Sequence, residues 1–174
     1  MKPQPKSFLQ TVPAVLLAVG LAGCGGGGVN TPPVPTPTPT PPPPPPRVVA
    51  EGSEALPAAA LGQLTFTTTL PGRIDATVNW TFEDDDFDVY LVRGDCTFQQ
   101  LRARQCDLAG FSENQLVKPE KVSASTVPAG RHQLFIGNRG PHDESLSFQV
   151  ILTPTAAASA ASAGPAPTWE VRRN

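Results

Sequence analysis

The sequence carries no excess of positive charge and few of the residues on which catalysis usually depends. Its 13 lysines and arginines are balanced by 15 aspartates and glutamates, so we expect no basic face for nucleic acid. A Ser-His-Asp arrangement built on His142 and Asp143 would lack both a nucleophile elbow and an oxyanion loop. The sequence therefore predicts a protein that is not an enzyme and that holds no cofactor, unless calcium binds as considered below.

Long apolar runs are also missing. The most apolar stretch, residues 8–21, is too short for a secure transmembrane helix. It follows two lysines, Lys2 and Lys6, and ends at the tetrapeptide LAGC, which is the order of parts in a cleavable export signal. LAGC resembles the lipobox of bacterial lipoproteins, with an ordinary secretory leader as the alternative.

The lipobox resemblance implies a location in the bacterial cell envelope. Residues 1–23 would be the signal peptide, and Cys24 would be acylated and become the new amino terminus. Several acyl chains hold a protein in a membrane because each buried methylene contributes about 0.8 kcal/mol. Gly25 follows the cysteine where an aspartate would favour inner-membrane retention in enterobacterial lipoproteins. The resemblance therefore implies the outer membrane rather than the inner membrane.

Residues 24–46 form a predicted tether. Four glycines follow the cysteine, and 11 of the 16 residues from Thr31 to Pro46 are proline. Such a segment populates polyproline II at about 3.1 Å per residue and would reach on the order of 50 Å. The tether is a stiff spacer in this interpretation; the alternative is a docking ligand for an aromatic groove.

Residues 47–153 carry the alternation of apolar and polar side chains that is typical of β-strands. Six short strands with turns between them, and no amphipathic helix, predict a single antiparallel β-sandwich. The stretch from Arg73 to Arg93 is interpreted as a β-hairpin with an acidic turn. The other predicted strands cover residues 64–69, 118–125, 131–136 and 145–152. Residues 154–174 are predicted to be a disordered tail.

Four segments of this domain have a familiar order: VNW at 78–80, DFDVYL at 86–91, VPAGRHQLFIG at 127–137 and SLSFQVIL at 145–152. In this order they resemble the bacterial pre-peptidase C-terminal domain. The resemblance implies a β-sandwich of jelly-roll type, in a family whose members include binders of collagen or polysaccharide and binders of calcium. The sequence departs from that pattern in having no attached peptidase and in carrying a cysteine pair.

Three cysteines are present, and Cys24 is assigned to the lipid. The remaining pair, Cys96 and Cys106, is predicted to form a disulfide in the oxidising compartment outside the inner membrane. Closing so short a loop stabilises a fold by roughly 2.5 to 3 kcal/mol in the chain-entropy model. A zinc site would need more ligands, and a redox role would need closer cysteines.

Five carboxylates crowd residues 83–88, a density of hard oxygen ligands that calcium requires. Asp84, Asp86 and Asp88 are the candidate calcium ligands. The spacing lacks the EF-hand pattern, and acidic residues are common in turns, so a solvated turn is the favoured interpretation.

The loop closed by the cysteines combines basic and aromatic side chains, as recognition surfaces often do. Phe98, Arg102 and Arg104 are its candidate binding residues. The alternative, which we favour at this point, is that the loop's apolar residues cap the sandwich core while its arginines are solvated. His132 falls in the inward register of a strand and is predicted to be a hydrogen-bonded core residue.

Together these features predict a lipid-anchored envelope protein with a non-catalytic binding or accessory module. Its partners would be the membrane, through the lipid, and an envelope protein or polysaccharide. The alternative function is a structural or assembly component of an envelope complex.

Overall fold

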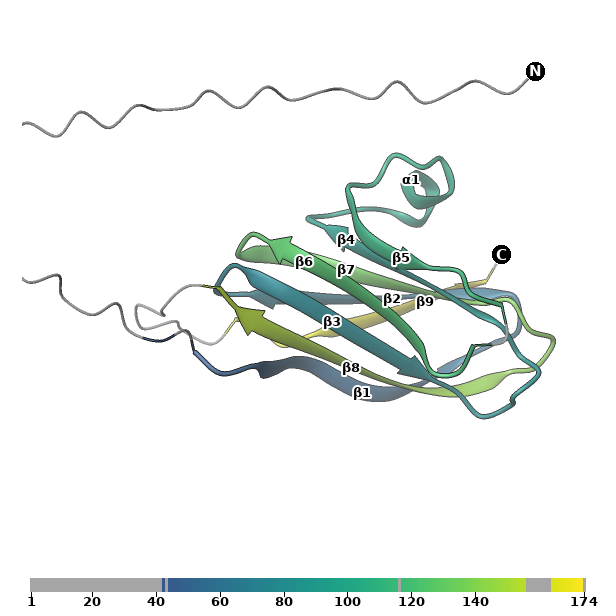
Figure 1. Ribbon diagram of the computed structural model, residues 1–174. Coiled ribbons are helices and arrows are strands. Elements are labelled where there is room, and N and C mark those ends of the chain that lie inside the picture. The colour runs from purple at the N-terminus through teal and green to yellow at the C-terminus, as the bar shows by residue number, and fades with distance from the viewer. Residues whose placement is uncertain (1–41, 43, 116, 156–163, 174) are drawn as a thin grey trace, which may run out of the picture. The chain divides into compact units, whose positions relative to one another are not determined.

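The computed structural model describes residues 42, 44–115, 117–155 and 164–173. The predicted signal peptide, Cys24 and nearly all of the tether therefore lie outside the described residues. From Arg47 onward the chain forms two antiparallel sheets packed face to face (Figure 1). The prediction of an all-β sandwich is confirmed.

Each sheet is assembled from strands that are distant in sequence. The four-stranded sheet has the order β1 (Arg47–Leu56), β8 (Glu144–Pro154), β3 (Gly72–Asn79) and β6 (Glu120–Val127). The five-stranded sheet has the order β5 (Leu108–Ser112), β4 (Phe87–Arg93), β7 (Gly130–Asn138), β2 (Ala60–Thr68) and β9 (Thr168–Arg173). The single short helix of the described chain is α1 (Phe98–Arg102). Among these residues no helix is long and apolar enough to span a membrane.

The core lies between the sheets and follows from the alternation of side chains along each strand. In β4 the odd-numbered residues face inward, so Phe87, Val89 and Leu91 are fully buried. Every second residue of the other central strands joins them, including Phe66, Ile74, Leu134, Ile136, Val150 and Leu152. The outward positions of the same strands are consequently free to build a second surface.

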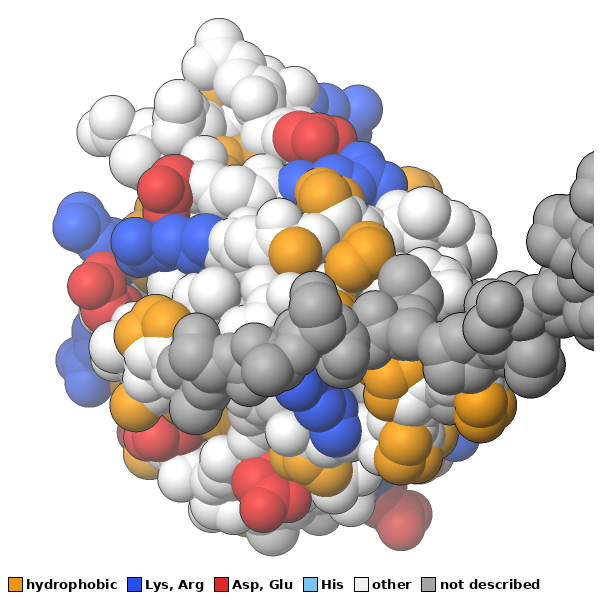
Figure 2. Space-filling model, turned by 90° about the vertical axis from the view of Figure 1, so that its left-hand side faces the viewer, with side chains coloured by type: hydrophobic (Ala, Val, Ile, Leu, Met, Phe, Trp, Pro, Cys, Tyr) orange, Lys and Arg blue, Asp and Glu red, His pale blue; other side chains and the backbone are white. Residues whose placement is uncertain are grey.

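The surface at the left-hand end of the sandwich, as drawn in Figure 1, is mixed in character. Figure 2 shows hydrophobic side chains there interspersed with charged side chains of both signs. Neither hydrophobic side chains nor charged side chains of one sign dominate the described part of this face.

The predicted hairpin over Arg73–Arg93 is wrong. β3 pairs with β6 and β8, whereas β4 pairs with β5 and β7 in the opposite sheet. The acidic segment between β3 and β4 is a crossover between sheets, at whose ends Trp80 and Phe87 stack with ring centroids 4.6 Å apart. Alternation indicates which face of a strand is buried, but it does not indicate the strand with which it pairs.

The prediction of a disordered tail is also corrected for its last residues. β9 pairs with β2 and forms the edge of the five-stranded sheet. Trp169 turns inward and stacks on Phe148, with ring centroids 5.9 Å apart. Gly62 leaves room for it, since a Cβ there would collide with the indole ring. One large aromatic side chain thus ties the C-terminal strand to the core.

Candidate binding pocket on the five-stranded sheet

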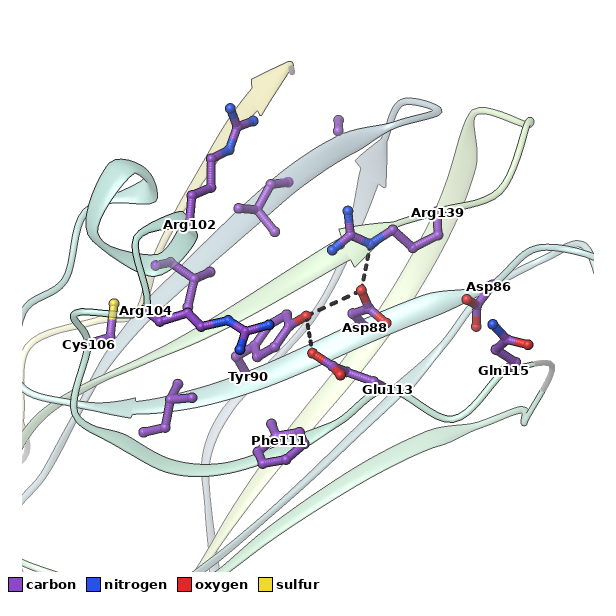
Figure 3. Close-up of a pocket in the computed structure, with 15 residues that line it drawn as sticks. Asp86, Asp88, Tyr90, Arg102, Arg104, Cys106, Phe111, Glu113, Gln115 and Arg139 are labelled. Carbon is purple, nitrogen blue, oxygen red and sulfur yellow. Dashed lines mark hydrogen bonds and ion pairs between the residues drawn. The ribbon is translucent and has the colours of Figure 1, made fainter.

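A pocket of about 890 Å³ lies on the outer face of the five-stranded sheet, beneath the loop closed by the two cysteines. Figure 3 shows Tyr90 on its floor and Arg104 reaching toward Tyr90 from the loop. Phe111 and Glu113 line the side formed by β5 and the residues after it. The remaining described lining includes Leu61, Asp86, Asp88, Arg102, Gln115, Gly137 and Arg139. This volume is within the usual range for small-molecule and cofactor sites.

The wall that carries the arginines is rigid for several independent reasons. Cys96 and Cys106 form the predicted disulfide. Between them, α1 begins with a capping box in which the Thr97 hydroxyl accepts from the Gln100 amide and the Gln100 side chain accepts from the Thr97 amide. A short helix capped in this way, inside a closed loop, presents Arg102 in a defined place.

The loop is also anchored on the sheet by a second apolar cluster, outside the main core. Phe98 packs edge-on against Phe135 with ring centroids 5.5 Å apart. Leu61, Val92 and Cys96 complete the cluster. The Cys96 amide donates to Gln133 Oε1 over 2.7 Å, which fixes the loop to β7 as well.

Arg104 has a left-handed backbone, with φ of 56°. Residues other than glycine adopt this conformation at a cost, and such positions cluster at functional sites. The helix ends just before it, because its amide donates to Leu101 O. The turn directs the Arg104 side chain into the pocket, as Figure 3 shows.

The floor of the pocket is a chain of charged and polar side chains from neighbouring strands. Arg139 Nε donates to Asp88 Oδ2, and the Tyr90 hydroxyl donates to Glu113 Oε1 over 2.7 Å (Figure 3). Burial, the hydrogen bond to Glu113 and the charge of Asp88 raise the pKa of Tyr90 above its ordinary value. Tyr90 is therefore neutral near pH 7 and acts as a hydrogen-bond donor.

The pocket also contains groups whose side chains have no protein partner in the described structure. Arg102 and Arg104 form no ion pair with the described residues, whereas Arg139 is paired with Asp88. The Phe111 ring is 61 % exposed.

No protein-family model and no curated protein matches this chain. What the pocket offers a ligand therefore follows from its geometry: two free guanidinium groups and an open aromatic face above a polar floor.

The candidate binding residues are placed in two different environments. Arg102 and Arg104 both line the pocket. Phe98 instead lies under the loop at 9 % exposure and anchors it to the sheet. The apolar residues of the loop were expected to cap the sandwich core. Phe98 instead covers the outer face of the sheet, and Phe111, after the loop, is exposed.

Several lining residues lie outside the set named from sequence, namely Tyr90, Glu113 and Arg139. The signal that could have found Tyr90 is its position between inward-facing Val89 and Leu91, which places it on the outer face of β4. Arg139 and Glu113 follow the ends of β7 and β5, and no sequence pattern places them beside β4.

The three candidate calcium ligands do not converge. Asp86 and Asp88 line the pocket, and Asp88 is occupied by Arg139. Asp84 lies instead with Asp85 and His142, and the ligand atoms of these three are within 4.8 Å of one another. The hydrogen bond from His142 Nδ1 to Asp85 raises the pKa of His142, as do the charges of Asp85 and Asp84.

His132 is a hydrogen-bonded core residue, as predicted from its register. It is 1 % exposed, and its Nε2 lies 3.1 Å from both Pro128 O and Thr68 Oγ1. This position excludes it from the pocket, which is on the other face of the sheet.

Proposed function

We propose that this protein is a lipid-anchored cell-envelope module that binds a glycan in the pocket on the five-stranded sheet. The observation that carries the proposal is the set of unpaired polar and aromatic groups in that pocket. Arg102, Arg104 and the Phe111 ring face it without protein partners among the described residues, on a rigid wall and beside a polar floor.

The chemistry of this lining suits a sugar better than a flat protein surface. Neighbouring hydroxyls of a sugar ring pair with planar forked groups such as guanidinium, carboxylate and amide, which exchange two hydrogen bonds at a time. The apolar face of the ring packs on an exposed aromatic side chain, here Phe111. A pocket of about 890 Å³ is also concave, whereas protein interfaces are broad patches.

The charges of the lining favour a ligand without a large net charge. Three arginines, Arg102, Arg104 and Arg139, face three carboxylates, those of Asp86, Asp88 and Glu113. The net formal charge of the lining is therefore zero. Neutral hydroxyl-rich chains match such a surface, and strong electrostatic steering is not expected.

The expected location supports the same function. A lipid at Cys24 followed by a proline-rich spacer would hold the domain on the order of 50 Å from the membrane surface, within reach of envelope polysaccharide. The resemblance to a domain family that includes polysaccharide binders agrees with this proposal.

The test is binding of purified envelope polysaccharides and their oligosaccharides to the full chain in detergent. Arg104→Ala and Phe111→Ala should each weaken binding by about tenfold, because each removes a contact of roughly 1.4 kcal/mol. Neither side chain belongs to the core, so the melting temperature should not change. Lys121→Ala, which removes a positive charge from the four-stranded sheet, is the matched control.

Two results would contradict the proposal. Binding that persists undiminished in an Arg104→Ala, Phe111→Ala double variant would place the ligand elsewhere. Absence of glycan binding, together with co-purification of fixed protein partners after mild detergent extraction, would support the assembly role instead.

A further inference from the structure

The loops at one end of the sandwich bring together two carboxylates and an imidazole that do not line the pocket. Asp84 and Asp85 belong to the crossover between β3 and β4, and His142 belongs to the connection between β7 and β8. Their ligand atoms all lie within 4.8 Å of one another. We propose that Asp84, Asp85 and His142 form a binding site for a divalent transition-metal ion.

Asp85 is the first reason for this assignment. Its side chain is fully buried, and its Oδ2 has no hydrogen-bond partner among the described residues. Among the described residues the other oxygen has one hydrogen-bond partner, His142, which belongs to the same cluster. Buried charges in proteins are paired or coordinate metals, because desolvation of an ionised carboxylate is costly. A metal ion at this cluster would supply the partner that the buried Asp85 Oδ2 lacks among the described residues.

The spacing of the two inner ligands is the second reason. His142 Nδ1 and Asp85 Oδ1 are 2.9 Å apart. Two ligand atoms that are each about 2.1 Å from a tetrahedrally coordinated ion lie about 3.4 Å apart. The pair would have to open by only about 0.5 Å to reach the separation of neighbouring ligands. Asp84 is exposed, so its side chain can rotate to close the remaining distance.

The surrounding structure holds both loops in place before any ion binds. Asn138 is 1 % exposed. Its side-chain Nδ2 donates to His142 O over 2.8 Å, and its side-chain Oδ1 accepts from the Gly140 backbone amide. Arg139 N donates to Asp86 O over 2.8 Å and joins the two loops directly. Gly140 leaves the space into which the Asp85 carboxylate fits, since a Cβ there would collide with it.

The composition of the cluster selects the class of metal. Calcium takes six to eight ligands that are all oxygen. An imidazole with two carboxylates suits zinc, cobalt or nickel, and the two negative charges neutralise a divalent ion. Three protein ligands leave further positions for water, and the ion would brace the two loops against each other.

The experiment is calorimetric titration of the full chain in detergent with zinc chloride and, separately, with calcium chloride. One zinc ion per chain should bind, at least tenfold more tightly than calcium, and should raise the melting temperature. Asp84→Asn, at an exposed position that does not endanger folding, and His142→Gln should each weaken zinc binding at least tenfold. Glu83→Gln, a neighbouring carboxylate outside the cluster, should not.

Cobalt supplies a second readout, because its visible absorption reports the ligands directly. The spectrum of the cobalt-loaded protein should change in His142→Gln and not in Glu83→Gln. The proposal is overturned if zinc fails to bind at millimolar concentration, which would leave an Asp85–His142 ion pair only. It is equally overturned if binding survives both Asp84→Asn and His142→Gln, or if calcium binds more tightly than zinc.

Discussion

His132 lies in the core with one ring nitrogen satisfied and the other without a partner. Its Nε2 is 3.1 Å from Pro128 O, and because a carbonyl only accepts, Nε2 carries the proton. Nδ1 is buried and has no partner among the described residues. A second proton would have to enter there without an acceptor. Burial accordingly lowers the pKa of His132 below its ordinary value.

This lowered pKa predicts a loss of stability in weak acid. Below about pH 6.5 the unfolded chain binds a proton at this histidine that the folded chain does not, so the free energy of unfolding should fall as the pH decreases from there. His132→Gln, which cannot titrate, should be less stable at pH 7.5 but should show a shallower decline. Urea unfolding between about pH 5.5 and about pH 7.5 measures both effects.

His142 must be held constant in that experiment. Its raised pKa acts with the opposite sign, since its contribution to stability is present below the unfolded pKa and is lost as the pH rises through the folded one. Both chains should therefore carry His142→Gln. Equal pH slopes for the two chains would show that His132 does not titrate as its environment requires.

At the scale of the element, β9 reaches the core through Trp169, whose ring lies against Gly62 and stacks on Phe148. Gly62→Ala should destabilise the fold by about 1 to 3 kcal/mol, because the new Cβ collides with the indole ring. Trp169→Ala should cost about 2 kcal/mol, less than a fully buried tryptophan, since the ring is only partly buried. In the double variant the collision is absent, so the combined loss should be clearly smaller than the sum.

Gly137→Ala is the matched control for this cycle. Gly137 is also in the interior of a strand, but a Cβ there would meet its neighbours at 3.5 Å or more, which is ordinary contact. Its effect should be within about 0.5 kcal/mol. Strictly additive losses for Gly62→Ala and Trp169→Ala, measured by urea unfolding, would show that β9 does not dock through this ring.

The same strands show how far sequence reasoning reaches. The alternation over residues 87–93 and 145–152 predicted strands that the structure contains, because burial of one face imposes a period of two. Pairing was not predictable in this way, so the crossover between β3 and β4 was mistaken for a hairpin. β9 was missed because it is nearly all exposed and therefore leaves no apolar alternation to detect.

The pocket was predictable only in part, for a related reason. Arg102 and Arg104 were recognisable because a disulfide loop marks its own residues as a unit. Tyr90, Glu113 and Arg139 come from three places in the chain that only the sheet order β5-β4-β7 brings together. The proposed metal site likewise depends on His142, which belongs to a different loop from Asp84 and Asp85. The density of acidic residues in the sequence pointed only to neighbouring carboxylates as its ligands.

At the scale of the whole molecule, anchoring and recognition are assigned to separate parts of the chain. The pocket depends on the sandwich and the Cys96–Cys106 loop. Membrane attachment is proposed to depend on Cys24. In this proposal the three cysteines have two different chemical roles, and the roles can be separated by substitution.

Cys24→Ser should move the protein from the membrane fraction to the soluble fraction and abolish labelling with palmitate, because the hydroxyl cannot carry the thioether-linked lipid. Glycan binding should be unchanged, since no lining residue of the pocket is altered. A chain with both Cys96→Ser and Cys106→Ser is the matched control: it should stay in the membrane fraction but lose roughly 2.5 to 3 kcal/mol of stability, the entropy of the opened loop. Fractionation, palmitate labelling and urea unfolding measure the three quantities. A Cys24→Ser chain that remains in the membrane would locate the anchor elsewhere and remove the basis for the proposed tether.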